Sequence, residues 1–159
     1  MSFITVAKYH VLGILLLVLL NGPGCQILGP EEGSLDDLSV KRSTWSEWSG
    51  GTYSFVVFRG CFCVWEGAVW IQVVDQEITA AFWTERNEPV PPEHFNELHT
   101  IDELFDMIQR AEREADEIEV EWADEGYPSR VFIDWIEEAI DDELFLEISS
   151  VVPGIAQID

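Results

Sequence analysis

The sequence predicts an α+β fold in which two helices pack on one face of an antiparallel sheet of about six strands. Several short segments alternate apolar and polar residues between turn signals, which is typical of strands with one buried face. Two other segments repeat apolar residues at helical spacing. Their order along the chain is α-β-β-β-α-β-β-β, and packing both helices on one face would bury the apolar side of every element.

The N-terminal segment has the layout of an export signal. A weakly basic start precedes a run of ten apolar residues, Val11 to Leu20, and a short stretch of small residues. A spanning helix needs about 20 apolar residues, so a permanent transmembrane anchor is the weaker interpretation. We expect a signal peptide at 1–24, a tether at 25–33, a single domain at 34–153 and a C-terminal tail at 154–159.

The cysteine that follows the small residues predicts lipid attachment. Gly22-Pro23-Gly24-Cys25 resembles a bacterial lipobox, although Gly22 stands where a typical lipobox has leucine. Simple cleavage before Cys25 is the alternative. One acyl chain holds a protein at a membrane only reversibly, so several chains are needed for a stable anchor. Since Gln26 follows instead of Asp, we expect the outer membrane in a Gram-negative cell and otherwise the outer face of the cytoplasmic membrane.

The charge balance excludes some partners. The chain has 31 acidic and 8 basic residues, a net charge of -23, which argues against binding to nucleic acid or anionic lipid. Two interpretations stay open: recognition of a cationic partner or Ca²⁺, and a solvated surface adapted to high salt. With 47% hydrophobic residues and seven tryptophans, the chain is expected to fold.

The first predicted helix begins after Ser34, a candidate N-cap. Helical spacing places Leu35, Leu38, Trp45 and Trp48 on one face, and the glycine pair at 50–51 ends the helix.

A three-stranded meander follows, with strands at 52–65, 68–74 and 77–83 and turns at 66–67 and 75–76. In its first strand seven residues alternate to one face, unless Gly60 marks a bulge that shifts the register. These residues are Tyr53, Phe55, Val57, Arg59, Cys61, Cys63 and Trp65.

The second half begins with a proline-rich loop at 84–99 and a capping box at Thr100 to Glu103. The following helix repeats apolar residues at Ile101, Leu104, Phe105, Ile108, Ala111 and Ala115. Three strands are then predicted at 118–122, 129–135 and 144–152.

These landmarks together resemble an uncharacterised family of bacterial secreted and lipid-anchored domains of unknown function. The likeness covers residues 40 to 150, and two positions depart from the pattern: Gln76 replaces a glycine, which weakens the expected tight turn, and Trp122 replaces a tyrosine. The resemblance implies location and fold but no activity. The matching residues are Trp45, Tyr53, Cys61, Cys63, Leu104, Phe105, Gly126, Tyr127, Pro128, Asp134 and the acidic group Asp141-Asp142-Glu143.

Four states are open to Cys61 and Cys63. Soft thiolates suit a metal ion, yet the spacing of His94 and His99 does not place two further ligands on one helical face. A redox pair is usually Cys-x-x-Cys at a helix N-terminus, and free thiols are the third alternative. We predict a structural disulfide, which suits an oxidising compartment. Because alternate Cα atoms in a regular strand lie about 6.6 Å apart, it requires a bulge at Gly60 or a kink at Phe62.

No other pattern predicts catalysis. The group Asp141-Asp142-Glu143 lacks the ligand spacing of an EF-hand and is more typical of a solvated turn than of a Ca²⁺ site. Gly126-Tyr127-Pro128 is a candidate surface motif at a turn, and Asp134 has no catalytic partner nearby in sequence. No nucleophile, P-loop or dinucleotide motif is present.

We therefore expect neither an enzyme nor a cofactor. The sequence favours a lipid-anchored envelope module that binds a protein, a peptide or a wall component, and no nucleic acid. The alternative is a thiol- or metal-dependent periplasmic accessory protein.

Overall fold

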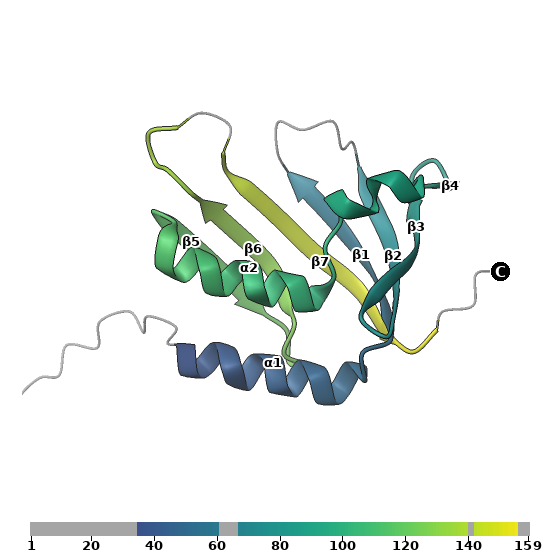
Figure 1. The fold of residues 1–159 in the computed structure, drawn as a ribbon, viewed down its shortest axis with the longest axis horizontal. Coiled ribbons are helices and arrows are strands. Elements are labelled where there is room, and N and C mark those ends of the chain that lie inside the picture. The colour runs from purple at the N-terminus through teal and green to yellow at the C-terminus, as the bar shows by residue number, and fades with distance from the viewer. Residues whose placement is uncertain (1–34, 61–66, 140–141, 156–159) are drawn as a thin grey trace, which may run out of the picture. The chain divides into compact units, whose positions relative to one another are not determined.

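A computed structural model describes residues 35–60, 67–139 and 142–155, all within the unit Gly33–Asp159 (Figure 1). Ser34, the predicted N-cap, and the side chain of Leu35 lie outside the described part. The helices and strands are α1 (Leu35–Ser49), β1 (Tyr53–Gly60), β2 (Ala68–Val74), β3 (Glu77–Trp83), β4 (Glu88–Pro89), the 3-10 helix η1 (Pro92–Glu97), α2 (Ile101–Glu114), β5 (Glu117–Trp122), β6 (Pro128–Asp134) and β7 (Leu144–Pro153).

The described strands form one antiparallel sheet of seven strands in the order β4-β3-β2-β1-β7-β6-β5. Two meanders, β1-β2-β3 and β5-β6-β7, meet where the first long strand pairs with the last. The predicted α+β class and element order are confirmed. The seventh strand is β4, which the sequence assigned to a loop because of its prolines. It pairs with Phe82 and Trp83 at the sheet edge, where Pro89 disrupts no interior ladder.

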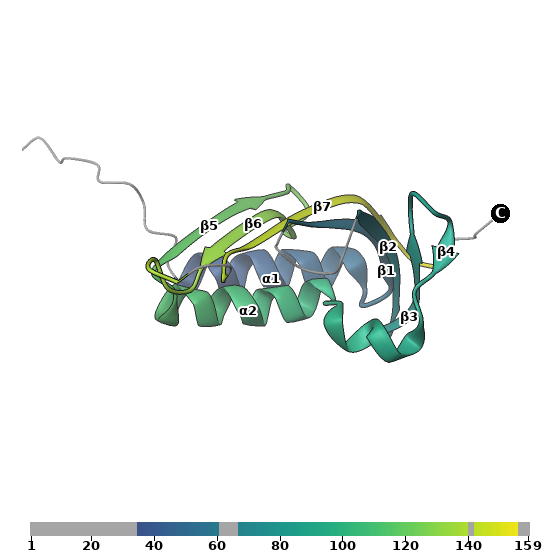
Figure 2. The same cartoon turned by 90° about the horizontal axis from the view of Figure 1, so that it is seen from above.

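Both helices lie on the same face of the sheet (Figure 2). The core between helices and sheet is closely packed and rich in aromatic rings, with Trp45 edge-on to Tyr53 at 4.7 Å between centroids. Its largest side chains, all less than 2% exposed, are Trp45, Tyr53, Phe55, Phe105, Ile71, Ile101, Leu104, Ile108 and Ile133. The opposite face of the sheet carries no helix among the described residues.

Helix α2 matches its sequence pattern. The Thr100 side chain accepts a hydrogen bond from the Glu103 backbone (3.1 Å), and the Glu103 carboxylate accepts one from the Thr100 backbone (2.8 Å), which completes the predicted capping box. The apolar face is buried as expected, at Ile101, Leu104, Phe105, Ile108 and Ala111.

Helix α1 ends as predicted, since Gly50 and Gly51 both have positive φ, but its buried face differs slightly. Leu38 and Trp45 are buried, whereas Trp48 is 37% exposed and Ser49 is buried in its place. At about 100° per residue, Ser49 lies about 40° from Trp45 around the helix and Trp48 about 60° away on the other side. The sheet therefore contacts the Ser49 side.

The turn between β2 and β3 is tight despite the departure from the family pattern. Asp75 and Gln76 have φ of 51° and 68°, as a type I′ turn requires. The Asp75 backbone N–H donates to Thr52 Oγ1 (3.4 Å), and that of Gln76 donates to the Gly51 carbonyl (3.0 Å). Hydrogen bonds from the α1–β1 connection thus hold the turn that the sequence predicted to be weakened.

Candidate functional site

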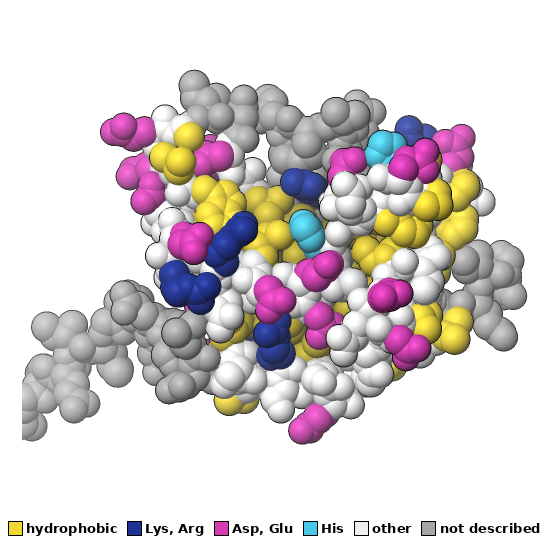
Figure 3. Space-filling view, in the orientation of Figure 1, with side chains coloured by type: hydrophobic (Ala, Val, Ile, Leu, Met, Phe, Trp, Pro, Cys, Tyr) yellow, Lys and Arg dark blue, Asp and Glu magenta, His cyan; other side chains and the backbone are white. Residues whose placement is uncertain are grey.

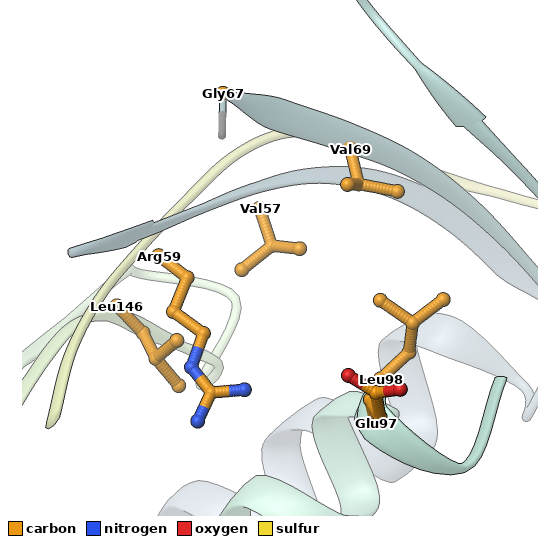
Figure 4. Close-up of a pocket in the computed structure, with 7 residues that line it drawn as sticks. All are labelled: Val57, Arg59, Gly67, Val69, Glu97, Leu98 and Leu146. Atoms are coloured by element: carbon orange, nitrogen blue, oxygen red, sulfur yellow. The ribbon is translucent and has the colours of Figure 1, made fainter. Parts of the chain in front are cut away.

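The candidate site is a pocket on the helix-bearing face, at the end of β1. We call it the Arg59 pocket. Its cavity measures about 30 Å³, room for one or two water molecules or the tip of a ligand. Arg59 and Leu98 point into the same space from opposite sides (Figure 4). The pocket is lined by Val57, Arg59, Gly67, Val69, Glu97, Leu98 and Leu146.

Strand alternation places Arg59 here. Tyr53 and Phe55 face the helices and are fully buried, and Val57 and Arg59 continue that row but are only half-buried. The helix-bearing face of the sheet is thus less deeply buried toward this end of β1. Regular pairing of Arg59 with Leu146 keeps the guanidinium on the core side of the sheet. The space-filling view shows hydrophobic side chains in a hollow on this face, with basic and histidine side chains at its rim (Figure 3).

The Arg59 side chain contains a buried donor without a partner. Its Nε is inaccessible to water and makes no hydrogen bond to any residue that the structure describes. An unsatisfied buried donor costs about 1–3 kcal/mol, and this chain has 31 acidic residues that could have supplied an acceptor. Among the other arginines, Arg42 and Arg130 form ion pairs with Asp106 and Glu121. Arg86 and Arg110 lie over the rings of Trp83 and Trp135.

Arg59 carries the positive charge of the pocket, because the histidine near it, His99, is neutral. Burial lowers the pKa of His99; the charge of Glu103 opposes this shift, and the charge of Arg59 adds to it. The imidazole is therefore neutral at neutral pH. On the other side of the pocket, Glu97 pairs with His94 at 2.9 Å.

This arrangement can bind a small anion. A guanidinium presents several N–H donors in a plane and binds carboxylates through two parallel hydrogen bonds. Apolar walls, formed by Val57, Val69, Leu98 and Leu146, lower the local dielectric constant and strengthen such a contact. Among the described residues, no group of three or more His, Cys, Asp or Glu side chains is placed to hold a metal ion.

The sequence did not single out Arg59. The available signal was its position, because it is a charged residue in a row whose preceding members, Tyr53, Phe55 and Val57, are apolar. An arginine on the buried side of a strand requires a partner or a ligand.

The predicted cysteine sites, Cys25, Cys61 and Cys63, lie outside the described residues, and lipidation and the disulfide stay predictions. The pairing next to the cysteine segment is described. Gly60 pairs regularly with Phe145, and the register shift between β1 and β7 lies between Ser54 and Val56. The bend that the disulfide requires, a bulge at Gly60 or a kink at Phe62, stays a prediction, because the described ladder ends at Gly60.

The Gly126-Tyr127-Pro128 motif joins the β5–β6 turn to α1. Gly126 and Pro128 are buried, and Tyr127 is half-buried with its ring 5.7 Å from that of Trp45. A Cβ at position 126 would lie 2.6 Å from the Lys41 carbonyl oxygen. The structure thus assigns the motif to packing between a turn and a helix.

Asp134 lies at the end of β6 beside other acids. Desolvation and repulsion from Asp142, together with weaker repulsion from Glu143 and Asp116, raise its pKa, while a hydrogen bond from the Ile136 backbone opposes the shift. Both carboxylate oxygens of Asp142 are buried without a partner among the described residues. The adjoining Asp141 lies outside the described part, and no ligand set is assembled here.

Comparison with known proteins identifies a family, but this family has no described activity. A family model described as a family of unknown function, DUF6174, matches residues 37–153. No curated protein and no solved structure matches the chain. Within the described helices, none is long and apolar enough to cross a membrane.

Proposed function

The chain belongs to the DUF6174 family, and from this premise we propose that it is a lipid-anchored domain of the cell envelope that acts by binding. The recognised group is a carboxylate of a protein, a peptide or a wall component, and the Arg59 pocket receives it. Attachment through Cys25 would hold the domain at the membrane.

The observation that carries the proposal is the buried Arg59 Nε without a partner among the described residues. A ligand carboxylate that enters the cavity beside Arg59 would pair with its guanidinium, and charge-assisted hydrogen bonds are about twice as strong as neutral ones. The cavity of about 30 Å³ admits the end of a ligand only, so the rest of the partner lies outside the pocket.

The pocket is tested with a matched pair of small probes, N-acetylalanine and its amide, which differ in the carboxylate. At constant ionic strength, backbone NMR signals of Gly67 and Leu98 are expected to shift with the acid and not with the amide. The variant Arg59→Met should abolish these shifts, whereas Arg86→Met should retain them, because Arg86 stacks on Trp83. Equal shifts with both probes, or unchanged shifts in Arg59→Met, would overturn the binding proposal.

The anchor is tested separately by fractionating cells and measuring the intact mass of the native protein before and after reduction. Acylation at Cys25 is expected as an added mass in the membrane fraction. A soluble, unacylated chain would remove the anchor and leave the pocket untouched.

The alternative is a thiol- or metal-dependent accessory protein of the periplasm. Its support is positional: the cysteine segment connects Gly60 and Gly67, and Gly67 and the neighbouring Arg59 line the pocket. Replacing Cys61 and Cys63 by serine decides between the two functions. Unchanged metal content and redox behaviour would exclude the alternative.

A further inference from the structure

The face of the sheet opposite the helices presents aromatic side chains instead of a polar surface. We call it the open face. No described helix covers it (Figure 2), although Ser54 and Gln72 at one end of it are buried. Strand alternation identifies its side chains, because the residues between those of the core row point away from the helices. Its large apolar residues are Val56, Phe58, Trp70, Phe82, Phe132 and Phe145.

These residues form a band that spans five strands, with Glu147 beside Phe58 where the band passes from β1 to β7. Trp70 pairs with Phe82 on one side, with ring centroids 6.0 Å apart, and with Val56 on the other. Phe58 follows along β1 and is 44% exposed. The band therefore runs without interruption from β3 through β2 to β1.

The band continues on β7 and β6. Phe145 pairs with Phe132, and its ring extends over Gly60, where an added Cβ would lie 3.2 Å from it. Arg130 lies over the Phe145 ring, 5.7 Å from the centroid. The glycine thus gives an aromatic side chain of the neighbouring strand the room to close the band.

Such a surface requires an explanation. An antiparallel sheet with one covered face usually turns polar residues to water on the other, and contiguous exposed apolar patches on a monomer mark interaction sites. On β1, β2 and β3 the middle of the open face contains no charged residue. The hydrophobic core of the domain lies on the other face of the sheet, against the helices.

The charges around the band indicate the class of partner. Glu119 and Glu121 on β5 and Glu147 on β7 share the open face, and the basic residue there, Arg130, is paired with Glu121 at 3.0 Å. The net charge of the chain is -23. A second copy or an anionic membrane would place like charges in contact, which opposes association.

We propose that the open face is a docking surface for a basic, amphipathic polypeptide segment. Apolar side chains of the partner cover the aromatic band, and its lysines or arginines meet the carboxylates on β5 and β7. Cations can also lie over the aromatic rings, as Arg130 does over Phe145. This surface and the Arg59 pocket lie on opposite faces of the sheet, and neither proposal depends on the other.

Synthetic ten-residue peptides test the proposal. One alternates leucine and lysine, a second alternates leucine and glutamate, and a third alternates glycine and lysine. Their ends are blocked so that no terminal carboxylate enters the Arg59 pocket. Binding is measured by calorimetry at constant ionic strength, and the leucine-lysine peptide is expected to bind at least about tenfold more tightly than either control, a difference of about 1.4 kcal/mol.

Variants locate the binding surface. Phe58→Ser should weaken binding of the leucine-lysine peptide about tenfold, and Glu147→Gln, which changes charge alone, about two- to threefold. Val40→Ser on α1, where the side chain is 60% exposed, should leave affinity unchanged.

Three results would overturn the proposal. They are failure of the leucine-lysine peptide to bind, equal affinity for the glycine-lysine peptide, and affinities unaffected by both Phe58→Ser and Glu147→Gln. A dimer in sedimentation that dissociates in Phe58→Ser would assign the open face to a second copy instead. Unchanged amide spectra outside the open face establish that each variant is folded.

Discussion

Tyr53 connects the first strand to the start of α2 through its hydroxyl group. The side chain is fully buried, accepts a hydrogen bond from the Ile101 backbone N–H (3.0 Å) and donates one to the Asp102 carboxylate (3.3 Å). Burial and the charge of Asp102 raise the pKa of Tyr53, so the hydroxyl keeps its proton. It satisfies one of the backbone donors that a helix leaves free at its N-terminus.

Replacing this hydroxyl should destabilise the domain. In Tyr53→Phe the Ile101 N–H loses its acceptor inside the protein, and we expect the free energy of unfolding to fall by about 1–3 kcal/mol. Urea denaturation followed by tryptophan fluorescence measures the change. Tyr127→Phe is the matched control, because no hydrogen bond joins the Tyr127 hydroxyl to another described residue, and it should cost less than about 0.5 kcal/mol. Equal losses in both variants would contradict this role of Tyr53.

Gly126 is required for the close approach of a turn to a helix. It has φ of 91°, and a Cβ there would lie 2.6 Å from the Lys41 carbonyl oxygen and 2.9 Å from the Trp45 nitrogen. Neither contact is with a flexible side chain. The backbone of α1 itself would have to move.

Gly126→Ala should therefore cost more than backbone strain alone. Gly154 offers the comparison, since its φ is 86° and a Cβ there would meet nothing within 4 Å. We expect Gly154→Ala to lose about 1–3 kcal/mol through strain, and Gly126→Ala to lose a further 1–3 kcal/mol, roughly, through overpacking. Differential scanning calorimetry compares the two, and similar losses would show that the contact with α1 yields easily.

At the scale of the elements, sequence patterns correctly predicted the features that depend on neighbouring residues in the chain. The capping box at Thr100, the helix stop at Gly50 and the alternation of β7 are all confirmed, because each depends on neighbours within a few residues. Strand β4 was missed, since its ladder is short and contains Pro89. Arg59 appeared in the correct alternating row, but its missing partner is a property of the packed structure.

The β2–β3 turn should accept the family's preferred residue with a gain in stability. Gln76 has φ of 68°, a conformation that costs an L-residue about 1–2 kcal/mol, whereas glycine adopts it freely. After the larger backbone entropy of unfolded glycine is subtracted, Gln76→Gly should stabilise the domain by about 0.5–1 kcal/mol. Thermal unfolding measures the shift. Thr79→Gly, inside β3, is the control and should destabilise; a loss of stability in Gln76→Gly would contradict the turn assignment.

At the scale of the whole molecule, the central pairing of β1 with β7 was beyond sequence patterns. Alternation identifies which side of each strand faces inward, but not which strand lies beside it. The Arg59 pocket depends on this pairing, because Leu146 of β7 forms the wall next to Arg59. The open face depends on it too, since Phe145 reaches Gly60 only across this junction.

Salt should stabilise the domain. The chain has 31 acidic and 8 basic residues and a net charge of -23, so most carboxylates have no cation to pair with, and repulsion opposes compact states. Raising NaCl from 0.05 to 1 M shortens the screening length from over ten to about 3 Å. We expect the unfolding midpoint to rise by at least about 3 °C, equivalent to about 1 kcal/mol.

Millimolar CaCl₂ is the control for this salt effect. If the acidic surface serves general salt adaptation, NaCl of equal ionic strength reproduces the shift that Ca²⁺ causes. A larger shift with Ca²⁺ would instead indicate specific cation binding, and an unchanged midpoint in NaCl would contradict the role of repulsion.

The pairing of β1 with β7 also determines when the sheet can close during synthesis. When α1 and the first meander have emerged from the ribosome, the inner edge of β1 is unpaired. Its partner is β7 (Leu144–Pro153), which follows all the other strands in the chain. Unpaired strand edges are open to association with other chains. The inner edge of β1 therefore stays unpaired until β7 has emerged, and only then can the centre of the sheet close.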